Sequence, residues 1–149
     1  MTERKTPRRR SDYAEFHTVQ TRWNDNDQYG HVYNVAYLEL FDEALNRAMV
    51  ARGLLDHRGE GPIQVVVELG CTYFREISYP DQPAIGLKLA DMGRSSLRVE
   101  MGMFRDGDDE ECAAAFSVLV TVDSATHRPL PTPQAQRDLL RGLVMPEPG

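Results

Sequence analysis

A polar loop that runs straight into an apolar helical pattern is the feature that most constrains this chain. Residues 24–33 read NDNDQYGHVY and contain two carboxylates, Asp25 and Asp27, together with a glycine and a histidine. From Asn34 onward, apolar residues recur at helical spacing as far as Gly53, a residue typical of helix ends. Titratable side chains directly before a buried helix have one of three roles: they cap the helix, they bind a ligand, or they take part in catalysis.

The rest of the chain reads mostly as strands. Strands joined by short turns must be antiparallel, and an antiparallel sheet needs a cover on one face. The central helix is the only long apolar element that could provide it, and residues 134–143 predict a short terminal helix. We therefore predict an α+β fold, in which a curved antiparallel sheet of about five strands wraps around the central helix. The stretches that alternate apolar and polar residues are 16–23, 63–77, 85–89, 97–103 and 116–122.

Charge is distributed unevenly along the 149 residues. The net charge is −6, but the first ten residues carry +4, which leaves −10 for the remainder. We expect residues 1–13 to form a disordered basic arm and residues 14–145 to form one domain. A domain this acidic is a poor partner for nucleic acid.

Two cysteines and the absence of long apolar runs bear on location and on metal binding. Cys71 and Cys112 form no CxxC pair and have no histidine-rich surroundings, so no metal site is expected. No stretch approaches the roughly 20 apolar residues that a membrane-spanning helix needs, so no membrane partner is expected. Two thiols without an export signal favour the reducing cytoplasm.

The loop and the helix start together resemble the hotdog-fold thioesterases of the 4-hydroxybenzoyl-CoA thioesterase type. That family has a strand ending in an aromatic residue, then DxDxxGHVxN, then a helix rich in Tyr, Leu, Phe and acidic residues. Residues 22–34 and 37–44 fit this pattern, and the order of elements matches across roughly residues 14–125. The resemblance implies a single hotdog domain that hydrolyses an acyl-CoA thioester to free acid and CoA. It also implies no metal or other cofactor, and self-association as a homodimer or homotetramer.

The same resemblance suggests roles for individual residues. It implies that Asp27 attacks the thioester carbonyl or activates a water molecule, and that the backbone N–H near Asn34 polarises the carbonyl oxygen. A helix N-terminus offers unpaired N–H groups where an oxyanion develops, which fits the second role. His31 is a further catalytic candidate whose role the sequence leaves open. The residues predicted to contact the acyl group or the CoA moiety are Tyr29, Gly30, Tyr33, Tyr37, Arg94, Ser95 and Ser96.

Several other interpretations of these residues stay open. Asp27 could simply cap the loop or the helix, and Asp25 is expected to bond loop backbone or Arg22. Hotdog hydratases have a histidine five residues after an aspartate, a spacing that His31 does not have, so the motif argues against a hydratase. Another thioesterase clade carries its catalytic carboxylate on the central helix, which makes candidates of Glu39, Asp42 and Glu43. Outside enzymology, the alternative is a non-catalytic protein that binds acyl-CoA or a small apolar ligand.

Overall fold

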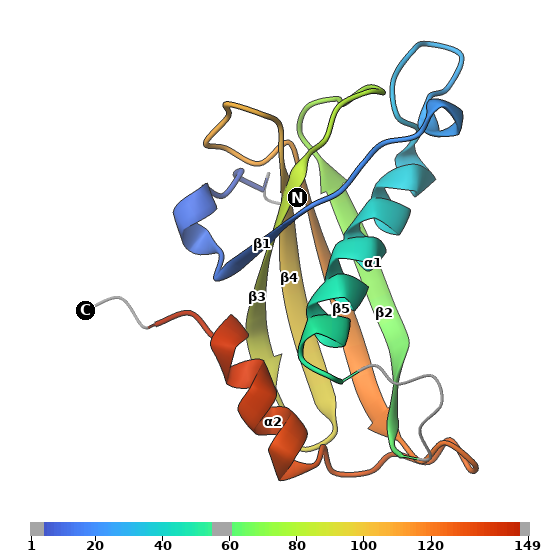
Figure 1. The fold of residues 1–149 in the computed structure, drawn as a ribbon, viewed down its shortest axis with the longest axis vertical. Helices are drawn as coiled ribbons and strands as arrows, with labels where there is room; N and C mark the ends of the chain where they lie inside the picture. Colours follow the sequence, from blue (N-terminus) through green and yellow to red (C-terminus); the bar gives the residue numbers. More distant parts are fainter. Residues whose placement is uncertain (1–4, 55–60, 147–149) are drawn as a thin grey trace.

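The computed structural model describes residues 5–54 and 61–146. Five strands form one antiparallel sheet in the order β1-β3-β4-β5-β2, and the sheet is open, with β1 and β2 at its edges (Figure 1). No helix among the described residues is long and apolar enough to cross a membrane. The elements are β1 (Glu15–Thr18), α1 (Asn34–Ala51), β2 (Ile63–Tyr73), β3 (Ala84–Met92), β4 (Ser96–Phe104), β5 (Ala113–Val122) and α2 (Gln134–Leu140).

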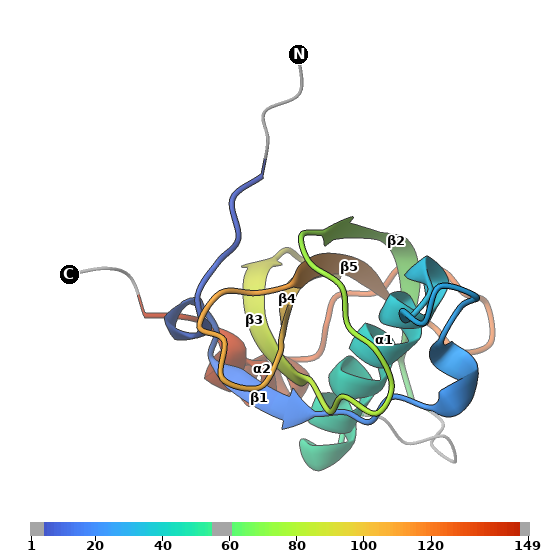
Figure 2. The same ribbon diagram turned by 90° about the horizontal axis from the view of Figure 1, so that it is seen from above.

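The long helix α1 is the centre of the core. Its buried residues recur at three- to four-residue spacing, and Phe41 and Ala44 are essentially inaccessible to solvent. The sheet curves around this face of the helix, as the view along the molecule shows (Figure 2). Inward side chains of β3, β4 and β5 complete the cluster, among them Ile85, Val99 and Met103. The predicted hotdog architecture is thereby confirmed.

Two predicted strands are shorter in the structure. The first ends at Thr18 rather than at Trp23, because Trp23–Asp25 turns as a short 3-10 helix. The long strand β2 ends at Tyr73 rather than at residue 77, and the chain then leaves the sheet edge. The loop connecting α1 to β2 lies mostly outside the described residues.

The sequence predicts a disordered arm over residues 1–13, but in the structure residues 8–13 pack against the sheet and the β4–β5 loop, and residues 1–4 lie outside the described part of the chain. Tyr13 is buried, and its hydroxyl donates to the carboxylate of Glu111 at 2.9 Å. Arg8 donates its backbone N–H to the same carboxylate at 3.0 Å, and Arg10 donates to backbone carbonyls of the loop between β4 and β5. The segment therefore crosses the face of the sheet opposite α1 (Figure 2). The positive charge of the N-terminal segment predicted solvent exposure, whereas the buried side chain of Tyr13 packs the segment against the sheet.

An ion pair joins the first strand to the end of α1 and gives a testable dependence of stability on pH. The guanidinium of Arg52 donates to both carboxylate oxygens of Glu15, at 2.8 and 2.9 Å. These bonds lower the pKa of Glu15 from 4.5 to about 2. The folded pKa lies below the unfolded one, so the stabilisation is complete above about pH 4.5 and is lost as the pH falls towards 2.

Replacing Glu15 by Gln should therefore lower the free energy of unfolding near pH 7. We expect a loss of about 2 kcal/mol, less than the full pKa shift would give, because solvent partly screens the pair. Urea denaturation of both proteins near pH 7 and near pH 3 measures this difference, which should shrink in acid. A difference that stays constant with pH would contradict the assigned pKa.

Candidate active site

The loop before α1 is a tight, internally bonded turn. Asp27 donates its backbone N–H to the carbonyl of His31 at 2.7 Å, and Gly30 donates to the carbonyl of Asp27 at 3.1 Å. Gly30 has a φ of +79°, a left-handed conformation that residues with a Cβ rarely adopt. The flanking residues Asn26 and Val32 pair as an antiparallel bridge. The loop is thus held by its own backbone before any substrate arrives.

The carboxylate of Asp27 is exposed, and only one of its oxygens is used by the loop. Oδ1 accepts the backbone N–H of Tyr29 at 2.8 Å and that of His31 at 3.3 Å. Among the described residues, no hydrogen bond or ion pair involves Oδ2. Asp27 therefore does hold the loop, as one alternative predicted, but its Oδ2 has no partner among the described residues.

The neighbouring Asp25 has a structural role, as predicted. Its side chain is only 2% exposed and accepts the backbone N–H of Arg22 at 2.7 Å and its guanidinium at 2.9 Å. Its carbonyl accepts the N–H of Tyr33 at 2.9 Å, which fixes the residue that precedes the helix. A buried, fully paired carboxylate of this kind positions the loop and is shielded from any ligand.

The start of α1 presents unused hydrogen-bond donors. Tyr33 is the N-cap residue, and no side chain of residues 5–54 or 61–146 caps this end of the helix. Within the described chain, the backbone N–H groups of Asn34 and Val35 have no acceptor, whereas Ala36 donates to the carbonyl of Tyr33 at 3.0 Å. Unpaired N–H groups and the helix dipole make this end favourable for negative charge.

The end of β2 forms the opposite wall, which the sequence did not indicate. Tyr73 donates its hydroxyl to the carbonyl of Asn34 at 2.7 Å, and its ring meets that of Tyr37 edge to face with centroids 5.0 Å apart. Tyr37 is buried, and its hydroxyl accepts the N–H of Ile77 at 3.0 Å. Burial raises the pKa of Tyr73 to about 12, so its phenol stays protonated and remains a donor near neutral pH. Tyr73 thus ties the first turn of α1 to the sheet.

His31 pairs with a residue just beyond β2. Its Nε2 lies 3.1 Å from a carboxylate oxygen of Glu76, and both side chains are substantially exposed. This pair joins the loop to the segment after β2. Among the described residues, the His31 ring makes no direct bond to the Asp27 side chain.

A cavity of about 540 Å³ joins these elements. It opens between the loop, the first turn of α1 and the end of β2. Of the predicted residues it brings together Asp27, Tyr29, His31, Asn34 and Tyr37. The lining residues that the predicted site did not include are Val32, Tyr73, Phe74, Arg75 and Glu76.

Three predicted contact residues are not near this cavity within one chain. Arg94, Ser95 and Ser96 lie at the turn between β3 and β4, at the end of the sheet opposite the loop (Figure 1). The carbonyl of Arg94 accepts the N–H of Thr132, and that of Ser95 accepts the N–H of Thr121, both at 2.8 Å. The turn is therefore packed against the chain that leads into α2. Gly30 and Tyr33 belong to the loop without lining the cavity.

The other candidate catalytic carboxylates, and the thiol of Cys71, have different surroundings. Glu39 pairs with Arg22 and Glu43 pairs with Arg47, each at 3.0 Å on the exposed side of α1. Asp42 accepts from Asn46 at 3.1 Å and borders a separate apolar groove between α1 and β2. Burial raises the pKa of the Cys71 thiol, which disfavours the thiolate that a nucleophile needs.

The sequence model of the thioesterase-like superfamily matches residues 21–140, which include the loop, α1 and all of the sheet except β1. The chain belongs to this superfamily. No curated protein matches it in sequence.

Solved structures place this thioesterase-like chain among hotdog proteins. The PA5185 protein of Pseudomonas aeruginosa strain PAO1 is 40% identical, with a TM-score of 0.89 over 93% of this chain and 97% of that one. A thioesterase from Thermus thermophilus, solved with coenzyme A and zinc, is 30% identical, with a TM-score of 0.73 over 88% and 95%. A 1,4-dihydroxy-2-naphthoyl-CoA thioesterase from Synechocystis, only 16% identical, shares the fold with a TM-score of 0.78 over 88% and 98% of the chains.

Proposed function

We propose that this thioesterase-like protein hydrolyses an acyl-CoA thioester to a free acid and CoA. The observation that carries the proposal is the shared cavity of Asp27 and the first turn of α1. One Asp27 oxygen is free, and the N–H of Asn34 has no acceptor in the described chain. A carboxylate and an oxyanion-binding donor on one cavity are the two groups that acyl transfer requires.

In the proposed reaction, the thioester carbonyl oxygen accepts a hydrogen bond from the N–H of Asn34. Asp27 either removes a proton from water, whose oxygen then attacks the carbonyl carbon, or attacks that carbon itself. In both cases the negative charge develops on the carbonyl oxygen at the helix N-terminus. Collapse of the tetrahedral intermediate breaks the carbon–sulfur bond, and the CoA thiolate takes up a proton to leave as the thiol. On the second route, water then hydrolyses the acyl–Asp27 anhydride.

Release of free thiol from a panel of aliphatic and aromatic acyl-CoA esters tests the function. We expect sustained release that is proportional to protein concentration. Tyr29 and Tyr37 line the cavity, which favours including aromatic acyl groups in the panel. The absence of release from every ester would overturn the proposal.

A single turnover in ¹⁸O-labelled water tests for attack by Asp27. Label in the protein shows that Asp27 formed an anhydride and that water attacked its aspartyl carbonyl. Label in the released acid is expected for the general-base route and also for water attack on the acyl carbonyl of the anhydride, so only label in the protein is diagnostic.

The proposed assembly is a homodimer or homotetramer joined through the exposed edge of β2. Several apolar side chains of this edge strand are exposed, among them Val66, Val67 and Leu69. Unpaired backbone groups and apolar side chains favour pairing with a second copy. Antiparallel pairing would bring the β3–β4 turn of that copy, with Arg94 and Ser95, to the same end of the joined sheet as the Asp27 loop.

Light scattering after gel filtration measures the assembly. We expect a molar mass of at least two chains for the native protein. Replacing Val67, which is 59% exposed, by Lys should shift the mass towards one chain, because it places charge on an apolar edge. A native protein that elutes as a single chain would contradict the dimer.

The predicted cytoplasmic location remains a proposal. The free thiols of Cys71 and Cys112 are compatible with it.

Tyr73 provides a further prediction about the site. Replacing Tyr73 by Phe keeps the ring against Tyr37 but removes the bond to the carbonyl of Asn34. We expect kcat to fall about tenfold with little change in KM, because the N–H groups at the helix start lose their fixed position. Steady-state kinetics measure both constants, and Tyr79→Phe, whose ring packs on Trp23, is the matched control. Equal effects of the two substitutions would contradict a positioning role.

A further inference from the structure

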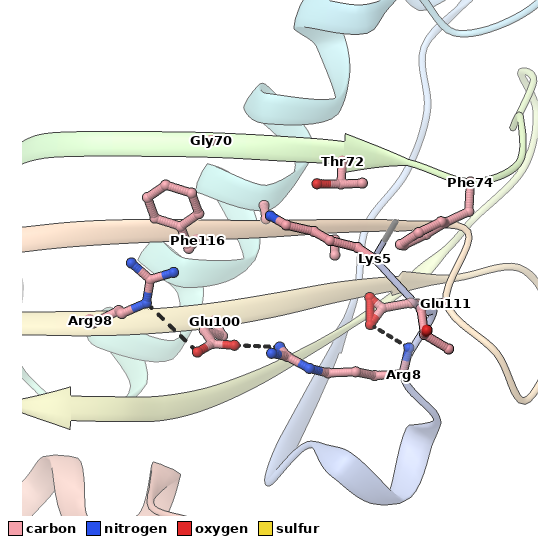
Figure 3. A pocket seen from close by; sticks show the side chains of 12 residues that line it. Lys5, Arg8, Gly70, Thr72, Phe74, Arg98, Glu100, Glu111 and Phe116 are labelled. Atoms are coloured by element: carbon pink, nitrogen blue, oxygen red, sulfur yellow. Dashed lines mark hydrogen bonds and ion pairs between the residues drawn. The ribbon is translucent and has the colours of Figure 1, made fainter. Parts of the chain in front are cut away.

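A second cavity, of about 340 Å³, lies on the face of the sheet opposite α1. Its walls come from β2, β4 and β5 and from the N-terminal segment that crosses them (Figure 3). Phe116 lies directly over Gly70, where a Cβ would approach its ring within 2.6 Å. The N-terminal wall is anchored because Glu111, buried beneath it, accepts from both Arg8 and Tyr13.

Positive side chains converge in this cavity. Lys5 and Arg98 point towards each other beside the ring of Phe116 (Figure 3). The guanidinium carbon of Arg98 lies 4.2 Å from the centre of that ring, and its Nε atom lies 3.7 Å from a carboxylate oxygen of Glu100. Glu100 is also paired with Arg8, whereas Lys5 has no ion pair among the described residues. Two converging cations over an aromatic ring, in a protein of net charge −6, favour an anionic ligand with a flat group.

Shared lining residues link this cavity to the candidate active site. A third cavity lies between them, sharing Lys5 and Thr72 with the Arg98 cavity, and Tyr73 and Arg75 with the Asp27 cavity. Phe74 lines all three. The path therefore runs from Asp27, past the end of β2, to the cations on the outer face. Position 74, just after the end of β2, is four residues from position 70, and four residues of extended chain span about 13 Å.

We infer that the Lys5–Arg98 cavity binds the phosphorylated nucleotide end of CoA, while the thioester lies at Asp27. This inference rests on the proposed function. CoA is an extended molecule whose phosphates and adenine are separated from the thiol by a long arm, and the two cavities are separated in the same way. Phosphates would meet Lys5 and Arg98, and the ring of Phe116 offers an apolar surface for the base. The N-terminal segment is then part of the substrate site.

Calorimetric titration with CoA tests the inference without requiring turnover. Lys5→Ala and Arg98→Gln should each raise the Kd for CoA about fivefold, as expected for the loss of one charge-assisted contact. Arg128→Gln removes the same charge at an exposed site away from the cavity and should leave the Kd unchanged. Inorganic phosphate serves as a second probe and should bind far more weakly than CoA. Phosphate binding as tight as that of CoA would overturn the nucleotide assignment.

Kinetics with two substrates separate this inference from the proposed function. The ratio of kcat/KM for an acyl-CoA to that for the N-acetylcysteamine thioester of the same acid should fall about fivefold in Lys5→Ala. If the thioesters are hydrolysed but CoA binds the Lys5 and Arg98 variants with native affinity, the inference is wrong and the function stands. If CoA affinity depends on Lys5 and Arg98 but no thioester is hydrolysed, the function is wrong and the binding site stands.

Discussion

Replacing Asp27 by Asn should lower kcat for thioester hydrolysis by about a thousandfold, within the range expected for loss of a general base. The substitution changes the charge and leaves the loop intact. The Asn side-chain oxygen can still accept the N–H groups of Tyr29 and His31, which Oδ1 of Asp27 accepts in the native protein. What is lost is the free carboxylate oxygen that would attack the carbonyl or deprotonate water.

Kinetics on Asp27→Asn require a control for the alternative carboxylate on the helix. Asp42→Asn is matched in chemistry, and Asp42 borders a separate groove. We expect this variant to keep nearly native kcat. Loss of activity in Asp42→Asn with retention in Asp27→Asn would transfer the catalytic role to α1. Unfolding measurements on both variants establish that they remain folded.

Replacing Tyr13 by Ala should lower the free energy of unfolding by about 4 kcal/mol, an effect typical of removing a large buried aromatic side chain. The ring of Tyr13 lies over Gly86 and Gly102, where a Cβ would approach it within 2.7 and 2.6 Å. Its hydroxyl also donates to the buried carboxylate of Glu111, and burial raises the pKa of that group. Removing Tyr13 therefore empties a packed site and leaves a buried carboxylate with fewer donors.

Urea denaturation measures this loss, and Tyr13→Phe divides it into two parts. The Phe variant keeps the ring and removes the hydroxyl, so we expect it to cost only about 1 to 2 kcal/mol. If Tyr13→Ala has the stability of the native protein, the N-terminal segment does not pack tightly against the sheet, and the prediction of a disordered arm is favoured.

The helix and the strands could be predicted because their periodicity reflects a single buried face. Burial of α1 at positions such as Leu40 and Phe41 follows directly from helical spacing. The packing of Tyr13 was harder to predict, because it depends on Gly86 and Gly102 being directly opposite each other on β3 and β4. Two glycines in the interiors of neighbouring strands were the available signal, since such glycines often mark a close approach by another group.

Only the part of the candidate site that is formed by residues close together in the chain could be predicted. The loop that carries Asp27 leads directly into the helix start at Asn34, so one motif covers both. Tyr73 and Glu76 lie at this site because β2 pairs with the rest of the sheet. The sequence around these residues does not predict that pairing. Arg94 was assigned by resemblance alone, and within one chain it lies at the far end of the sheet.

The most direct test of the central claim is the number of CoA molecules released per protein chain. A binding protein that holds acyl-CoA releases no thiol beyond the uncatalysed background, however much substrate is present. We predict that the native protein releases many equivalents of CoA per chain from at least one acyl-CoA ester, and that Asp27→Asn does not. Release at the background rate by the native protein, together with tight acyl-CoA binding, would contradict the enzyme and favour the binding protein.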